Sequence, residues 1–178
     1  ITQTINFAHQ NNITINSEIP ITITGGENVV IDGTGLGTSS MFIIKTSQAV
    51  VIENIKFTNN KAKYGAAIDI EGSRSALVEV DVTINNCVFE KLEATSQGGA
   101  IYATYIDGKL VINNSVFTKN NASSWGGALA VTYSAYEGAL DLVINNTSFS
   151  DNFGNNAGGA YLMANTITIE NSNFTHNG

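Results

Sequence analysis

The stretch Leu-Val-Ile-Asn-Asn-Ser-Val-Phe-Thr-Lys-Asn-Asn-Ala-Ser-Ser-Trp-Gly-Gly-Ala-Leu, residues 110–129, decides the fold because its pattern recurs along the chain. Relative to Phe117, an aliphatic residue lies seven positions earlier, isoleucine five earlier and asparagine three earlier. A second asparagine lies three positions later, and Gly-Gly-Ala begins nine positions later. Such self-similarity at a nearly constant interval is typical of repeat architectures. The phenylalanines with these surroundings are Phe57, Phe89, Phe117, Phe149 and Phe174.

The positions around each phenylalanine agree from copy to copy. The aliphatic position holds Val50, Val82, Leu110, Leu142 and Ile167, and the isoleucine position holds Ile52, Ile84, Ile112, Ile144 and Ile169. The first asparagine is Asn54, Asn86, Asn114, Asn146 and Asn171. The second is Asn60, Asn120, Asn152 and Asn177, with Leu92 as the exception. Gly-Gly-Ala occurs at residues 98–100, 126–128 and 158–160, with the degenerate copy Gly65-Ala66-Ala67.

The spacing of the copies indicates a solenoid. Successive phenylalanines are 25 to 32 residues apart, whereas the distance from phenylalanine to Gly-Gly-Ala stays near nine, so one corner of each coil takes up the insertions. The repeated Val, Ile and Thr residues alternate with a period of two, as strand residues do. These features predict an all-β, right-handed, single-stranded parallel β-helix with three short strands per coil and six to seven coils.

The same pattern predicts the domain organisation and the interior. Residues 1–178 are expected to form one β-helix domain, with residues 1–28 as an N-terminal cap or irregular first coil and residues 29–178 as repeat coils. Because coils stack about 4.8 Å apart, the five phenylalanines are expected to stack inside. The five first asparagines are expected to form a buried ladder of amides, each hydrogen-bonded to the next coil.

Composition excludes several classes of function. The chain has 8 Lys+Arg against 15 Asp+Glu and a net charge of −7, which disfavours a nucleic-acid groove or a patch for anionic lipid. No apolar run reaches the roughly 18 residues of a membrane-spanning helix, so we expect no spanning segment in this chain. The single cysteine, Cys87, excludes an internal disulfide framework and a zinc site built on cysteine pairs.

The residues that could support catalysis form no tight cluster in the sequence. A hydrolase needs two or three carboxylates on one face, and no close pair of this kind is apparent. We therefore expect no catalytic residue, no metal site and no cofactor. A polysaccharide lyase or hydrolase is the less favoured alternative, since many secreted β-helices are such enzymes.

The variable corner supplies the best candidate for a binding surface. Insertions at residues 70–81, 102–109 and 132–141 all leave the coil at this corner. Stacked on successive coils, their aromatic side chains would form an exposed strip suited to a protein or glycan partner. The alternative is that these segments are lengthened strands whose tyrosines cover the sheet. The candidate residues are Tyr102, Tyr105, Tyr133, Tyr136, Arg74 and Glu137.

Asparagine-x-Ser/Thr sequons offer sites for N-linked glycans. Asn146 heads a sequon but is excluded, because the repeat places it in the predicted interior ladder. The remaining candidates are Asn12, Asn113, Asn121, Asn145 and Asn173.

The motif Phe117-Thr-Lys-Asn120 leading to Gly126-Gly127-Ala128-Leu129 resembles a known repeat. It is similar to the repeat of the polymorphic outer-membrane proteins, the autotransporter adhesins of chlamydia-type bacteria, over roughly residues 50–178. The resemblance implies a β-helical passenger that is exported and mediates adhesion. Two copies depart from the motif, since Leu92 replaces the second asparagine and Ala66 replaces the second glycine.

Repeat and resemblance together predict an extracellular or cell-surface protein that is not an enzyme. The first hypothesis is an adhesin or rigid display module that binds a protein or glycan receptor on another cell surface. The alternative is a glycosylated structural subunit whose open sheet edges self-associate end to end into a fibre.

Overall fold

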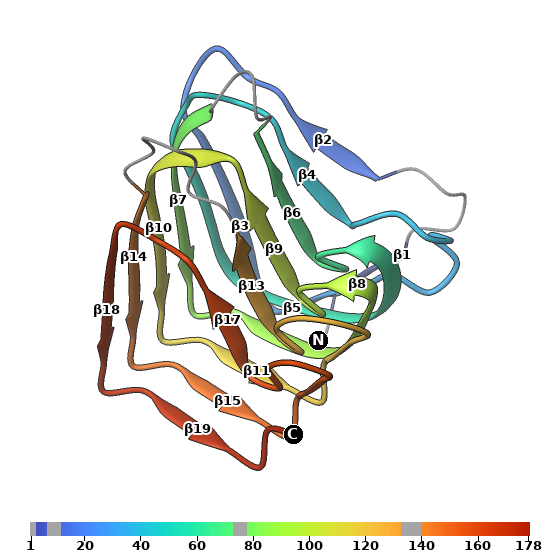
Figure 1. Cartoon of the computed structure of the whole chain (residues 1–178). Helices are drawn as coiled ribbons and strands as arrows, with labels where there is room; N and C mark the ends of the chain where they lie inside the picture. Colours follow the sequence, from blue (N-terminus) through green and yellow to red (C-terminus); the bar gives the residue numbers. More distant parts are fainter. Residues whose placement is uncertain (1–2, 7–11, 73–77, 133–139) are drawn as a thin grey trace.

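The chain folds into a parallel β-solenoid (Figure 1). The computed structural model describes residues 3–6, 12–72, 78–132 and 140–178. Within these ranges there are strands and turns and no helix, and all paired strands are parallel. The all-β parallel solenoid predicted from the repeat is therefore confirmed.

The described strands form two sheets. The larger contains β1 (Gln3–Asn6), β3 (Ile21–Asp32), β5 (Val50–Tyr64), β7 (Val78–Asn85), β8 (Val88–Gln97), β10 (Ile106–Asn113), β11 (Val116–Thr118), β12 (Asn121–Ala122), β14 (Leu140–Asn145), β15 (Ser148–Ser150), β16 (Phe153–Gly154), β18 (Thr166–Glu170) and β19 (Asn173–Thr175). The smaller contains β2 (Ile13–Ile15), β4 (Phe42–Ile44), β6 (Ile68–Glu71), β9 (Ile101–Thr104), β13 (Leu129–Thr132) and β17 (Ala160–Leu162).

Strand order gives the number of turns. Among the described residues, the smaller sheet stacks six strands in the order β17-β13-β9-β6-β4-β2, which leaves five steps between them. Each step is one turn, so the solenoid makes about five turns, and the prediction of six to seven coils was too high. In the larger sheet the long strand β5 pairs with both β7 and β8 and so joins two walls of the solenoid (Figure 1).

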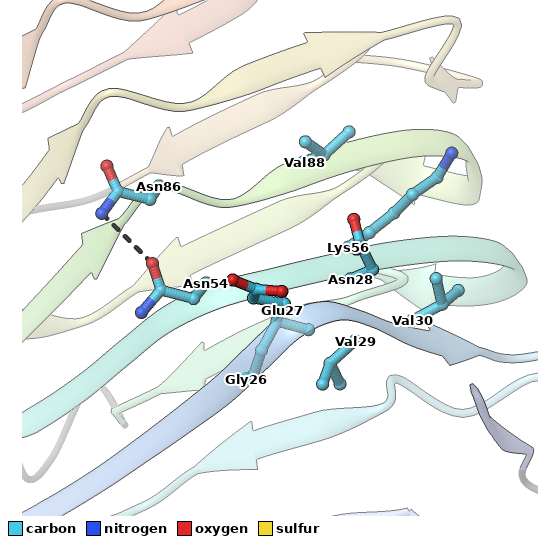
Figure 2. Close-up of a pocket in the computed structure, with 10 residues that line it drawn as sticks. Gly26, Glu27, Asn28, Val29, Val30, Asn54, Lys56, Asn86 and Val88 are labelled. Atoms are coloured by element: carbon cyan, nitrogen blue, oxygen red, sulfur yellow. Dashed lines mark hydrogen bonds between the residues drawn. The ribbon is translucent and has the colours of Figure 1, made fainter. Parts of the chain in front are cut away.

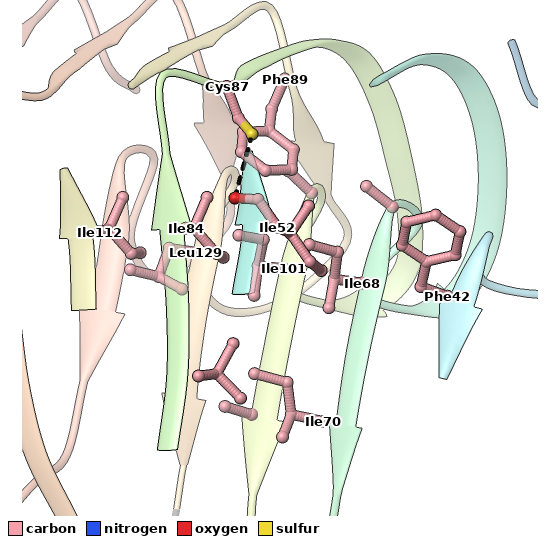
Figure 3. Packing of buried hydrophobic residues seen from close by; sticks show 14 of the residues in the cluster. Phe42, Ile52, Ile68, Ile70, Ile84, Cys87, Phe89, Ile101, Ile112 and Leu129 are labelled. Atoms are coloured by element: carbon pink, nitrogen blue, oxygen red, sulfur yellow. Dashed lines mark hydrogen bonds between the residues drawn. The ribbon is translucent and has the colours of Figure 1, made fainter. Parts of the chain in front are cut away.

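Like residues lie on like residues because the strands pair in register. Phe89 pairs with Phe57 and Phe117, and Phe117 with Phe149, and the rings stack with centroids 4.5–5.1 Å apart. Figure 3 shows Ile52, Ile84 and Ile112 in the interior, near aliphatic residues of the smaller sheet. Each such side chain is removed from water on all sides, which is the main source of favourable free energy. The phenylalanine row consists of Phe57, Phe89, Phe117 and Phe149, which are fully buried, and Phe174, which stacks on Phe149 but is 42% exposed.

The first asparagine of each repeat forms a corner and faces solvent, so the prediction that this row is buried was wrong. Asn114 and its equivalents adopt positive φ angles of 48° to 59°, a left-handed backbone that asparagine tolerates better than most residues. Their amides bond in pairs on the surface: Asn86 Nδ2 donates to Asn54 Oδ1 at 3.2 Å, and Asn146 Nδ2 donates to Asn114 Oδ1 at 2.6 Å. The residues of this corner row are Asn54, Asn86, Asn114, Asn146 and Asn171.

The second asparagine is the buried one. Asn120 and Asn152 are each 1% exposed. Asn120 Nδ2 donates to Asn152 Oδ1 and to the Phe89 carbonyl, both at 3.0 Å, while Asn120 Oδ1 accepts from the Leu92 N–H at 3.1 Å. Asn152 repeats these bonds with Asn177 Oδ1 and the Phe117 carbonyl. The side chains thus satisfy backbone groups at a corner where the strand ladder is interrupted.

We predict that Asn120→Ala destabilises the fold by about 3 kcal/mol, because it leaves buried donors and acceptors without partners. The matched control is Asn114→Gly at the exposed corner, where glycine accepts the left-handed backbone and the change should stay within about 1 kcal/mol. Urea unfolding followed by circular dichroism measures both. Equal losses in the two variants would contradict the assignment of the buried ladder.

Candidate functional site

The outer face of the smaller sheet carries one continuous row of side chains. Strand alternation turns Ile68 and Ile70 into the core, which leaves Asp69 on the opposite face of β6. Register then places Asp69, Tyr102, Ala130 and Tyr161 in one row across β6, β9, β13 and β17. The row runs along the solenoid axis, but Asp69 and Ala130 are buried, so a partner on this face would reach it through Tyr102 and Tyr161.

Four half-buried aromatic side chains form two stacked pairs on this face. Tyr64 stacks on Tyr102 with ring centroids 4.8 Å apart and planes 19° from parallel. Trp125 stacks on Tyr161 at 4.9 Å and 16°. In each pair the first residue directly precedes a corner glycine, and the second lies on the strand of the next coil. We call Tyr64, Tyr102, Trp125 and Tyr161 the aromatic strip.

The aromatic strip overlaps only partly with the predicted one. Tyr102 belongs to it, and its hydroxyl accepts a hydrogen bond from Thr132 Oγ1 at 3.1 Å. Tyr105 follows at the end of β9 with a φ of 52° and is half-buried outside the two stacks. The other four predicted residues lie outside the described residues: Arg74, Tyr133, Tyr136 and Glu137.

Sequence reasoning missed three of the four strip residues, although two had a readable signal. Tyr64 and Trp125 each stand immediately before the glycine of a Gly-(Gly/Ala)-Ala copy. Tyr161 was hidden by a change of register in the last coil. There Ala160 pairs with Leu129, so Gly158-Gly159-Ala160 does not align with Gly126-Gly127-Ala128 but is displaced by one residue. This shift puts Tyr161 in the same outer row as Tyr102.

A cluster of ionisable groups adjoins the row on the neighbouring coils. Asp69 is 5% exposed and shares a side-chain hydrogen bond with Glu71, which also forms an ion pair with Lys45 at 2.8 Å. Burial, reinforced by the negative charge of Glu71, raises the pKa of Asp69 to about 8. Asp69 is therefore mostly a neutral carboxylic acid at pH 7, and its Oδ1 has no hydrogen-bond partner.

Gln97 occupies the position between the two aromatic pairs. It pairs with Tyr64 on the preceding coil, and the Gly98 N–H that follows it donates to the Trp125 carbonyl on the next. The residue is half-exposed, yet its Oε1 is buried without a hydrogen-bond partner. The amide can turn outward without breaking a bond, which makes it a ready acceptor.

A second surface feature is a groove along the exposed asparagine corner (Figure 2). Its larger part, about 600 Å³, lies beside the β3–β5 irregularity between Thr24 and Val29 and is lined by Asn54, Asn86 and Val88 among others. A smaller part of about 200 Å³ continues along the same corner over Asn114, Asn146 and Asn171. The groove is open, and four of the asparagines that line it already bond to one another in pairs, Asn86 to Asn54 and Asn146 to Asn114.

The candidate glycosylation sites differ in exposure. Asn121 on β12 and Asn173 on β19 are exposed, whereas Asn12, Asn113 and Asn145 are half-buried. Asn113 Nδ2 also donates to Asn85 Oδ1 at 2.9 Å. Asn146 was excluded because it was expected inside. That reason was wrong, since Asn146 is exposed and its Nδ2 donates to Asn114 Oδ1.

No group of three or more His, Cys, Asp or Glu side chains in the described part of the chain could hold a metal ion. Cys87 is buried, its Sγ faces the Asn85 carbonyl at 3.3 Å, and burial raises the pKa of the thiol to about 11, which makes it unreactive at neutral pH. No helix in the described ranges is long and apolar enough to cross a membrane.

Comparison with known proteins identifies the repeat. Residues 114–132, which contain the Phe117–Asn120 motif and Gly126-Gly127-Ala128, match the family model described as the Chlamydia polymorphic membrane protein repeat. No curated protein and no solved structure gives a significant match. The matched segment and the solenoid fold together make this chain similar to repeat proteins of the polymorphic membrane protein type.

We predict that the stability of the protein falls as the pH rises from about 4 to about 8. The unfolded chain ionises Asp69 near its ordinary pKa of 3.8, whereas the folded chain holds this proton up to about pH 8, so the contribution of Asp69 is present at acid pH and lost with increasing pH. Urea unfolding at pH 5, 7 and 9 measures the effect. Asp69→Asn should flatten the profile, and the exposed control Asp81→Asn should not. A wild-type slope in Asp69→Asn would disprove this assignment.

Proposed function

We propose that this chain is part of a surface-displayed β-helix of the autotransporter passenger type that acts as an adhesin and has no enzymatic activity. The repeat match supports the first part, since polymorphic membrane protein repeats indicate an outer-membrane or cell-surface location. The solenoid is right-handed with three strands per coil, as parallel crossover connections favour. Such a structure carries a binding surface away from the membrane on a stiff support.

The observation that carries the adhesive role is the aromatic strip. Tyrosine and tryptophan are enriched at the energetically dominant positions of interfaces, and here four of them lie half-exposed on one face. The strands beneath them are bonded to neighbours on both sides along most of the solenoid. Ordering this surface on binding therefore costs little conformational entropy.

The position of the carboxyl groups also favours a binding role over a catalytic one. The carboxyl pair that the structure does bring together, Asp69 and Glu71, is tied to Lys45, and Asp69 is buried. A catalytic acid needs contact with substrate, whereas this acid lies beneath the surface. The partner of the module is a protein or glycan receptor on another cell surface.

We predict that beads coated with the purified chain attach to cells of a mixed eukaryotic and bacterial panel, and that Trp125→Ala/Tyr161→Ala reduces attachment by roughly tenfold. The control is Phe153→Ala, which removes an exposed aromatic ring from β16, outside the strip. Circular dichroism establishes that each variant is folded. Attachment that survives in the double variant at the wild-type level would overturn the adhesive role of the strip.

A further inference from the structure

The aromatic strip has a regular spacing along the solenoid axis. Tyr102 lies on β9 and Tyr161 on β17, with the β13 residue Ala130 between them in the same row. The two stacked pairs thus lie two coils apart, about 9.6 Å for strands spaced at 4.8 Å. A ligand that matches this surface is extended, runs along the axis and presents similar groups at a short, regular interval.

The strip is uncharged. None of Tyr64, Tyr102, Trp125 and Tyr161 carries a charge at neutral pH, and neither do the intervening Gln97 and Ala130. Asp69, the one acidic group in the row, is held in its neutral form by burial. A cation adjoins one end of the strip, where Lys63 Nζ lies 5.0 Å from the centroid of the Tyr64 ring. The remaining strip residues offer a highly charged partner no complementary charge, so the surface as a whole fits a neutral ligand better than an anionic one.

A hydrogen-bond acceptor without a partner lies between the two aromatic pairs. Gln97 Oε1 has no hydrogen-bond partner, and its half-exposed side chain can rotate toward a ligand. Hydroxyl groups donate to such an acceptor, while the C–H faces of a sugar ring pack on aromatic side chains. Aromatic surface combined with a few polar groups is the usual composition of a small-molecule site.

We propose that the aromatic strip binds a neutral, linear oligosaccharide that lies along the solenoid axis and contacts both aromatic pairs. This rests on the proposed function and specifies its partner. An unstructured peptide is the weaker fit, because its backbone would need partners for a donor and an acceptor at each residue, and the strip offers few. Each aromatic pair contacts one part of the sugar chain through the ring surface that its stacking partner leaves uncovered, with Gln97 bonded to a hydroxyl between the pairs.

The test uses the full chain and an array of neutral and anionic oligosaccharides of two to six sugar units, followed by titration calorimetry on the neutral linear binders. Affinity should rise roughly tenfold, or about 1.4 kcal/mol, once the oligosaccharide is long enough to reach both pairs. Trp125→Ala should abolish this gain and leave the affinity for the shortest oligosaccharides intact. Gln97→Leu should weaken binding several-fold, and Phe153→Ala should leave it unchanged.

The outcomes separate this inference from the adhesive role. Loss of cell attachment in Trp125→Ala/Tyr161→Ala without any binding on the array overturns the oligosaccharide proposal and leaves adhesion to a protein receptor standing. Binding restricted to anionic sugars, or binding with no dependence on length, overturns it as well. Retained attachment in the double variant counts against the adhesive role itself.

Discussion

Parallel pairing between successive coils is the constraint on which the rest of the structure depends. Once the backbones are bonded in register, each side chain must be compatible with the one a turn above and the one a turn below. Phe117 lies between Phe89 and Phe149, and Asn120 bonds to Asn152, an arrangement that fills the interior and satisfies its polar groups. Because the same requirement applies at every coil, the same residue types recur along the sequence.

This constraint explains what could be predicted. The rows of Phe, Ile and Asn are visible in the sequence, and so the parallel solenoid follows from them. The sequence does not reveal which of the two asparagine rows is buried, because asparagine fits a corner in both. The path of the backbone determines the answer, since it turns Asn114 outward and Asn120 inward. A further left-handed corner two residues after each phenylalanine is occupied by Asn59, Lys91, Lys119, Asp151 and His176, whose identities share no common signal.

The candidate site was harder to predict because it is not part of the repeat. Tyr64 and Tyr102 come from opposite sides of a glycine corner on different coils, and only the three-dimensional path of the chain brings their rings together. Tyr161 required the one-residue change of register in the last coil. The buried state of Asp69 likewise has no counterpart in its local sequence, which alternates as an ordinary strand.

Leu92 has a consequence for how the solenoid opens. The buried amide ladder runs from Asn120 to Asn177 and ends at the Leu92 N–H, while Asn60 on the preceding coil bonds instead to the Ser39 and Ala66 carbonyls and leaves its Oδ1 unpaired. The buried amide ladder is therefore interrupted between these coils, although Phe57 still stacks on Phe89 and the ion pairs Lys56–Glu90 and Lys61–Glu93 still link them. In a linear array whose cohesion is a sum of neighbour contacts, this joint relies more on those two partly exposed ion pairs, and added salt weakens such pairs while leaving the buried amide ladder of the later coils intact.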